Sequence, residues 1–179
     1  MAAFIDWYMK HSKHALTILE MVLFGMLAAL TFALQVVMGP LPNIEPVSLL
    51  VMLFAVTFGW KALYSVYIFV IMEILYYGIN VWNIYYLYVW TILAVAAILL
   101  RRMKSPVAWA LLSGVFGLLF GALCGIVDIF IGGFGYALAK WASGILFDVT
   151  HCVGNFVIAL VLFVPLQKLM ERLYTKVKR

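Results

Sequence analysis

Carboxylate, imidazole and amide side chains interrupt long apolar stretches of this sequence at helical spacing. Residues three, four and seven positions apart share one face of a helix, and two such faces are polar here. The first is formed by Glu73, Tyr76, Tyr77 and Asn80. The second is formed by Gly144, Asp148, His151 and Asn155, which lie within ~60° of one another at ~100° per residue. Because a charge in the middle of a membrane costs roughly 3 kcal/mol, each acid needs a partner, a proton or a cavity.

The sequence motifs give little support for an enzymatic activity. The sequence has no Gly-x-Ser-x-Gly, no His-Glu-x-x-His and no Walker A phosphate loop. Ser143 and His151 lie about 12 Å apart along a helix, which is too far for a nucleophile and its base. The two cysteines are not a closely spaced pair, so neither a zinc site nor a disulfide is indicated. We predict no catalytic residue, no metal site and no cofactor, although a carboxylate dyad of Glu73 and Asp128 stays open.

The composition requires lipid as the solvent for much of the chain. Hydrophobic residues make up 68% of the 179 residues, charged residues 11%, and the mean hydropathy is +1.14. A soluble domain of this size cannot bury so much apolar surface. We therefore predict a single all-α integral membrane domain over residues 1–179.

Six apolar stretches are predicted to be transmembrane helices. They cover about residues 15–38, 47–58, 62–78, 85–100, 107–131 and 143–165. Three prolines in residues 39–46 exclude a continuous helix there, and glycines predict a flexible loop from residue 132 to about residue 141. The predicted helix over residues 47–58 is short for crossing the ~30 Å hydrocarbon layer of a membrane.

The basic residues predict the orientation of these spans. With six spans, eleven of the twelve lysines and arginines lie on the side of the two termini, and only Lys140 lies opposite. The positive-inside rule then places both termini in the cytoplasm. The net charge of +5 is thus a topology signal and gives no support for nucleic-acid binding.

In this topology the polar side chains within the spans lie in the outer half of the membrane. The aromatic and amide side chains of residues 76–90 lie in the same half. We predict a binding cavity open to the outside. Its predicted substrate-binding residues are Asn43, Glu45, Glu73, Tyr77, Asn80, Trp82, Asn83, Tyr86, Asp128, Trp141, Asp148, His151 and Asn155. Internal pairing, of Asp148 with His151 or of Asp128 with Lys140, is the alternative for individual residues.

Small residues form two further helical stripes that let backbones approach closely. The first, Gly25, Ala29 and Ala33, fits either packing inside the bundle or docking of another membrane subunit. The second is formed by Gly114, Gly117, Gly121 and Gly125, for which internal packing is favoured.

Two segments carry a family resemblance. Residues 41–59, which begin LPNIEPVSLL, and residues 148–155, DVTHCVGN, resemble the substrate-binding S-components of energy-coupling factor (ECF) transporters, and the resemblance extends over residues 15–166. It implies a six-helix subunit of an ABC-type importer with an outward-facing vitamin site. It also implies partnership with a transmembrane coupling subunit and two cytoplasmic ATPases. The stripe of Gly25, Ala29 and Ala33 resembles the Ala-x-x-x-Ala docking motif of the first helix, from which Gly25 departs.

The cobalamin-specific S-components are the most similar branch, so cobalamin is the expected vitamin. An S-component for another vitamin is the alternative within this family. A small polytopic membrane enzyme, or a proton-coupled carrier that uses Asp128, Asp148 and His151, is the alternative outside it.

Overall fold

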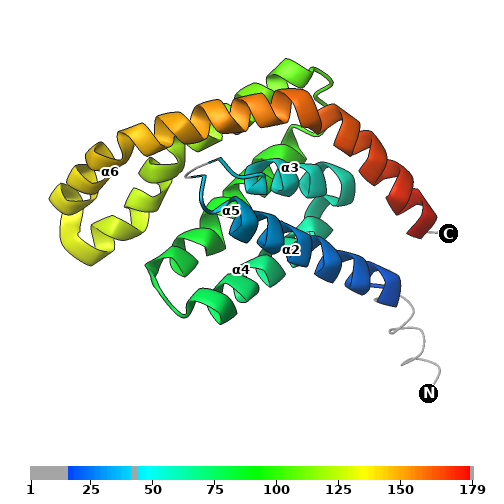
Figure 1. Cartoon of the computed structure of the whole chain (residues 1–179), viewed down its shortest axis with the longest axis horizontal. Helices are drawn as coiled ribbons and strands as arrows, with labels where there is room; N and C mark the ends of the chain where they lie inside the picture. The colour runs from blue at the N-terminus through cyan, green and yellow to red at the C-terminus, as the bar shows by residue number, and fades with distance from the viewer. Residues whose placement is uncertain (1–15, 42–43, 178–179) are drawn as a thin grey trace, which may run out of the picture.

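The described chain is a bundle of helices. The computed structural model describes residues 16–41 and 44–177, and it contains no strand within these ranges. The helices are α2 (Ile18–Met38), α3 (Val47–Phe58), α4 (Ala62–Tyr77), α5 (Val81–Leu99) and α6 (Pro106–Val177), with a 3-10 turn η1 (Gly59–Lys61) between α3 and α4 (Figure 1). The all-α prediction is therefore confirmed for the described residues.

Helix α6 consists of two arms that meet at Gly133. This glycine has φ 80° and ψ 174°, a left-handed conformation that other residues rarely adopt. The chain bends there, and the second arm (residues 134–177) runs back along the first (residues 106–132) (Figure 1). The predicted loop from residue 132 to about residue 141 is wrong, because one glycine suffices for the bend and helix resumes at once.

The turn between α4 and α5 is also shorter than predicted. Gly78, at φ 80°, ends α4, and Asn80 caps α5 with its side chain. Asn80 and Asn83 form a reciprocal capping box, in which each amide oxygen satisfies backbone N–H groups of the first turn. Helix α5 therefore begins at Val81 rather than near Tyr85.

Helix α3 lies at the centre of the bundle. It packs against helices α2, α4, α5 and α6 and against the turn η1. Of its residues only Val56 and Thr57 are not buried. A helix that is apolar all round is typical of such a buried position.

The outer surfaces of the other helices are apolar. Four helical segments, Ile18–Met38, Val47–Tyr77, Val81–Leu99 and Pro106–Lys176, are long and apolar enough to cross a membrane. Large hydrophobic side chains such as Ile18, Leu75, Phe130 and Leu146 are exposed on the surface. This is the pattern of a membrane protein, whose outer residues face lipid.

A polar network closes the end of the bundle at which the described chain starts and finishes (Figure 1). The carboxylate of Glu20, 4% exposed, accepts hydrogen bonds from Lys61 Nζ at 2.8 and 2.9 Å. The Tyr174 hydroxyl donates to the same carboxylate at 3.0 Å. Glu20 thus links α2 to η1 and to the end of α6.

Candidate functional site

A cavity of about 800 Å³ lies among α2, α4, α5, the two arms of α6 and the segment before α3. Such volumes are typical of small-molecule sites. All the predicted binding residues except Asn43 and Asn155 line it: Glu45, Glu73, Tyr77, Asn80, Trp82, Asn83, Tyr86, Asp128, Trp141, Asp148 and His151. Asn43 lies outside the described residues. The sequence prediction therefore brought together residues from three helices and one connecting segment that do share a cavity.

Asn155 is placed differently from the prediction. It continues the polar face of α6, but its amide nitrogen donates to Ser48 Oγ at 2.9 Å and to the Ser113 carbonyl at 3.3 Å. These bonds join α3 to both arms of α6. Asn155 therefore links these helices and does not line the cavity.

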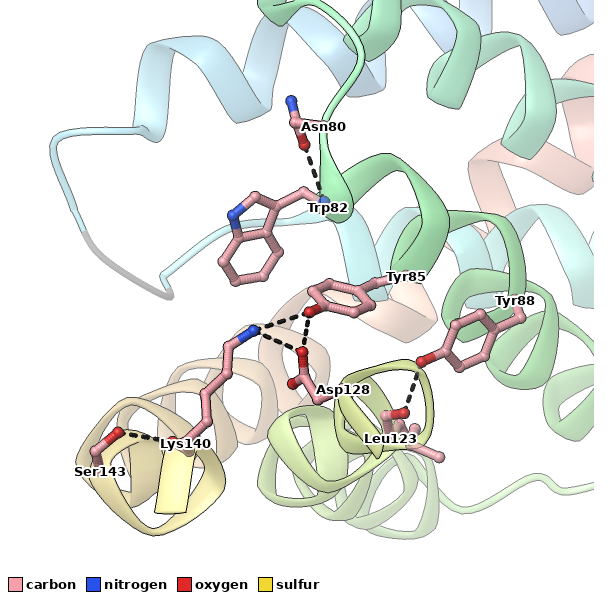
Figure 2. Close-up of polar contacts among 8 residues, drawn as sticks. All are labelled: Asn80, Trp82, Tyr85, Tyr88, Leu123, Asp128, Lys140 and Ser143. Carbon is pink, nitrogen blue, oxygen red and sulfur yellow. Dashed lines mark hydrogen bonds and ion pairs between the residues drawn. The ribbon is translucent and has the colours of Figure 1, made fainter. Parts of the chain in front are cut away.

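The capping box of α5 forms one rim of the cavity. The Asn80 side chain accepts from the Trp82 backbone N–H at 2.9 Å (Figure 2). The Asn80 N–H donates to the Asn83 side chain at 2.7 Å. The two amide oxygens are therefore committed to the backbone. The Trp82 ring, 55% exposed, is held at the first turn of α5 and meets the Tyr85 ring edge-on at 5.5 Å.

An ion pair joins the two arms of α6 at the side of the cavity. Lys140 Nζ lies 2.8 Å from the Asp128 carboxylate, whose side chain is 3% exposed. The Tyr85 hydroxyl donates to the same carboxylate oxygen and accepts from Lys140 at 2.8 Å (Figure 2). Asp128 is therefore neutralised within the protein, as the internal-pairing alternative expects for this residue.

The glycine stripe brings the polar face of the second α6 arm against the first arm. A Cβ atom on Gly117 would lie 2.8 Å from the backbone of His151, and one on Gly121 would lie 2.5 Å from the Asp148 carboxylate. The Gly121 backbone N–H donates to Asp148 Oδ1 at 3.0 Å. The predicted role of this stripe in internal packing is confirmed at these positions, whereas no atom lies within 4 Å of the corresponding point at Gly125.

His151 does not pair with Asp148. The imidazole is 2% exposed and contacts the Phe120 ring at 5.1 Å, and its Nε2 atom has no hydrogen-bond partner among the described residues. Asp148 instead bonds to Gly121. The Asp148–His151 pairing alternative is therefore wrong.

A second polar cluster lies between α2, α4 and α5. The Gln35 amide nitrogen donates to the Tyr86 hydroxyl at 3.2 Å. Glu73 is 5% exposed, and its Oε1 atom has no hydrogen-bond partner within the described chain. Burial, together with the nearby charge of Glu73, raises the pKa of the Glu45 carboxyl to about 7. These two acids therefore share one region of the cavity with Tyr86.

Sequence reasoning missed several lining residues. They include Gln35, Met38, Phe120, Lys140 and Phe147. Gln35 and Lys140 are polar residues in or beside apolar stretches and could have been found by that criterion. Phe120 and Phe147 carry no such signal, because aromatic residues are common on lipid-facing and core positions alike.

The predicted docking stripe lies on the outer surface of α2. Ala29 and Ala33 are exposed, and Gly25 is half-buried, with no atom within 4 Å of the point that a Cβ atom would occupy. The stripe therefore does not pack inside this bundle.

The cavity lining offers groups that can bind a small molecule. No three His, Cys, Asp or Glu residues of the described chain converge to hold a metal ion. What the cavity offers is aromatic surface, buried acids and unpaired hydrogen-bonding atoms.

Comparison of the chain with protein-family models, with curated proteins and with solved structures gives no significant match.

Proposed function

We propose that this protein is the substrate-binding S-component of an ECF-type importer, which captures a vitamin outside the cell. The observation that carries the proposal is the cavity of about 800 Å³, in which aromatic rings surround the buried, unpaired Glu73 and His151. An unpaired buried polar atom is costly unless a ligand or water completes its hydrogen bonds. The resemblance of residues 41–59 and 148–155 to S-components makes a vitamin the favoured ligand, with cobalamin first.

The proposed topology has six spans: α2, α3, α4, α5 and the two arms of α6, with both termini in the cytoplasm. The cavity lies beside Gly39, Leu41 and Glu45, beside Asn80 and beside Lys140, and no residue of the Glu20 network lines it. These segments would then face outside, where the ligand is collected.

The exposed face of α2 supports the partner proposal. Ala29 and Ala33 are exposed small residues, and small residues let a helix of another subunit pack closely. We assign this face to the transmembrane coupling subunit, which links the S-component to two cytoplasmic ATPases. The described chain has no nucleotide loop of its own, so ATP would be hydrolysed by those partners.

Gentle purification followed by native mass spectrometry, and titration with a panel of vitamins that includes cobalamin, tests the proposal. We expect one vitamin to bind without turnover, and the coupling subunit and ATPases to co-purify. Trp82→Ala should weaken binding, whereas Ile79→Ala is the matched control, since Ile79 is 92% exposed and does not line the cavity. Turnover of a substrate without an ATPase partner would favour an enzyme. Uptake by this chain alone, driven by a pH gradient, would favour a carrier.

A further inference from the structure

The unpaired atoms of the cavity are mostly hydrogen-bond acceptors. Glu73 Oε1 and Gln35 Oε1 are buried and have no partner among the described residues, and both residues line the cavity. A carboxylate oxygen can only accept unless it carries a proton. A bound molecule that completes these bonds must therefore bring donors.

The charges of the cavity lining also favour a ligand that brings hydrogen-bond donors. Its acids are Glu45, Glu73, Asp128 and Asp148, and its only lysine or arginine within the described chain is Lys140. That lysine already pairs with Asp128 at 2.8 Å. Three acids are thus left without a cationic partner, which makes the cavity a site for positive charge.

Aromatic faces surround these acids. Tyr77, Trp82 and Phe147 line the cavity and are each more than half exposed, so their rings are open to a ligand. A cation is attracted to the face of such a ring. The protein already uses this interaction at the same site, because Lys140 Nζ lies 5.2 Å from the centre of the Tyr85 ring.

We propose that the ligand is a flat heteroaromatic cation whose N–H donors face Glu73 and Gln35 while its ring lies among Tyr77, Trp82 and Tyr86. The inference rests on the vitamin-binding function proposed above, but the cavity lining favours a cationic vitamin over cobalamin, the vitamin that the sequence resemblance puts first. Glu45, on the segment before α3, supplies a second negative group to the same region. Anionic vitamins are disfavoured, because the only cation of the described lining is already paired.

The test is a titration of the purified full-length protein with four probes. These are thiamine, which carries a permanent positive charge and an aminopyrimidine donor, uncharged riboflavin, anionic biotin, and cobalamin. We expect thiamine to bind at least tenfold more tightly than the other three, which is about 1.4 kcal/mol. Glu73→Gln should weaken thiamine binding at least tenfold. Glu45→Gln serves as the second variant if Glu73→Gln does not fold.

The outcomes separate this inference from the proposed function. Tightest binding of riboflavin, biotin or cobalamin would overturn the cationic ligand but leave an S-component. Thiamine binding that neither glutamate variant weakens would also overturn it. Tight thiamine binding by a protein that co-purifies with no coupling subunit or ATPase would support the ligand class and overturn the importer function. Binding of no probe would overturn both.

Discussion

Lys140 and Asp128 lie on opposite arms of α6, and their side chains meet at 2.8 Å beside the cavity. The Tyr85 hydroxyl bonds to both, so α5 is tied to the same pair. Removing the lysine would leave a carboxylate that is 3% exposed with only the tyrosine as a donor.

Lys140→Met is therefore expected to destabilise the protein by roughly 2 to 3 kcal/mol, at or below the roughly 3 to 5 kcal/mol of a fully buried pair, because the lysine side chain is 40% exposed. Denaturation in detergent measures this. The double variant Asp128→Asn with Lys140→Met should recover more than half of the loss, since no buried charge remains. Simple addition of the two single losses would contradict the pairing.

The glycine contacts between the arms of α6 predict a contrast between two alanine substitutions. At Gly117 a methyl group would lie 2.8 Å from the backbone of His151, which cannot rotate away, so Gly117→Ala should cost about 1 to 3 kcal/mol. Gly125→Ala meets no atom within 4 Å and should be neutral or stabilising by up to about 1 kcal/mol, the helix-propensity gain. Thermal unfolding of both variants in the same detergent decides the matter, and equal effects would argue against close contact of the arms.

Glu45 predicts a pH dependence of stability in the ligand-free protein. Burial and the charge of Glu73 raise the pKa of the Glu45 carboxyl to about 7, above its ordinary value of 4.5. The folded state therefore holds this proton more tightly than the unfolded state, so the contribution of Glu45 is full below pH 4.5 and is lost as the pH rises to about 7. The loss amounts to at most about 1.4 kcal/mol for each pH unit in that range.

Unfolding midpoints measured between about pH 4.5 and 8 test this, with Glu45→Gln as the variant that should flatten the curve. Glu73, Asp148 and His151 also line the cavity and can exchange protons in this range. A slope that Glu45→Gln leaves unchanged would show that one of those groups is responsible.

The exposed stripe of α2 predicts a separation of binding from transport. Ala29→Trp or Ala33→Trp should abolish vitamin uptake in cells while leaving ligand affinity within about twofold, because the bulky ring would prevent close helix packing. Val161→Trp, at a position that is 61% exposed on the second arm of α6, is the control and should transport normally. Equal loss of affinity and uptake would make the stripe a structural feature.

The proposed orientation predicts which turns a membrane-impermeant thiol reagent reaches. In a protein without Cys124 and Cys152, Ile79→Cys should be labelled in intact cells, and Arg102→Cys only after permeabilisation. Both native side chains are exposed, so accessibility within the bundle is matched. The reverse labelling pattern would show that the protein has the opposite orientation, with the cavity on the cytoplasmic side.

Helical periodicity in the sequence was enough to predict most residues of the candidate site. The faces of Glu73 with Tyr77 and of Asp148 with His151 were predictable, because a polar residue at i, i+3 or i+4 has a fixed direction on its helix. The partner of each group was less predictable. Asp148 bonds to the backbone of Gly121, a choice that depends on how closely two helices approach rather than on residue type.

The bend at Gly133 shows a second limit of prediction from the sequence. Three glycines within four residues indicate flexibility by composition, yet only Gly133 takes a left-handed conformation, and Gly132 and Gly135 remain helical. Packing of the second arm along the first compensates for the poor helix propensity of this segment. Lys140 therefore lies on a helix, at a place from which it can reach Asp128.

The buried position of α3 has a consequence for assembly of the protein. Twelve residues extend only about 18 Å, and nearly every side chain faces a neighbouring helix, so lipid cannot stabilise α3 as an independent span. Its insertion must follow, or accompany, the gathering of its neighbours. Substitutions inside α3 should accordingly be recognised by cellular quality control as failures of maturation, even where the ligand never contacts the altered residue.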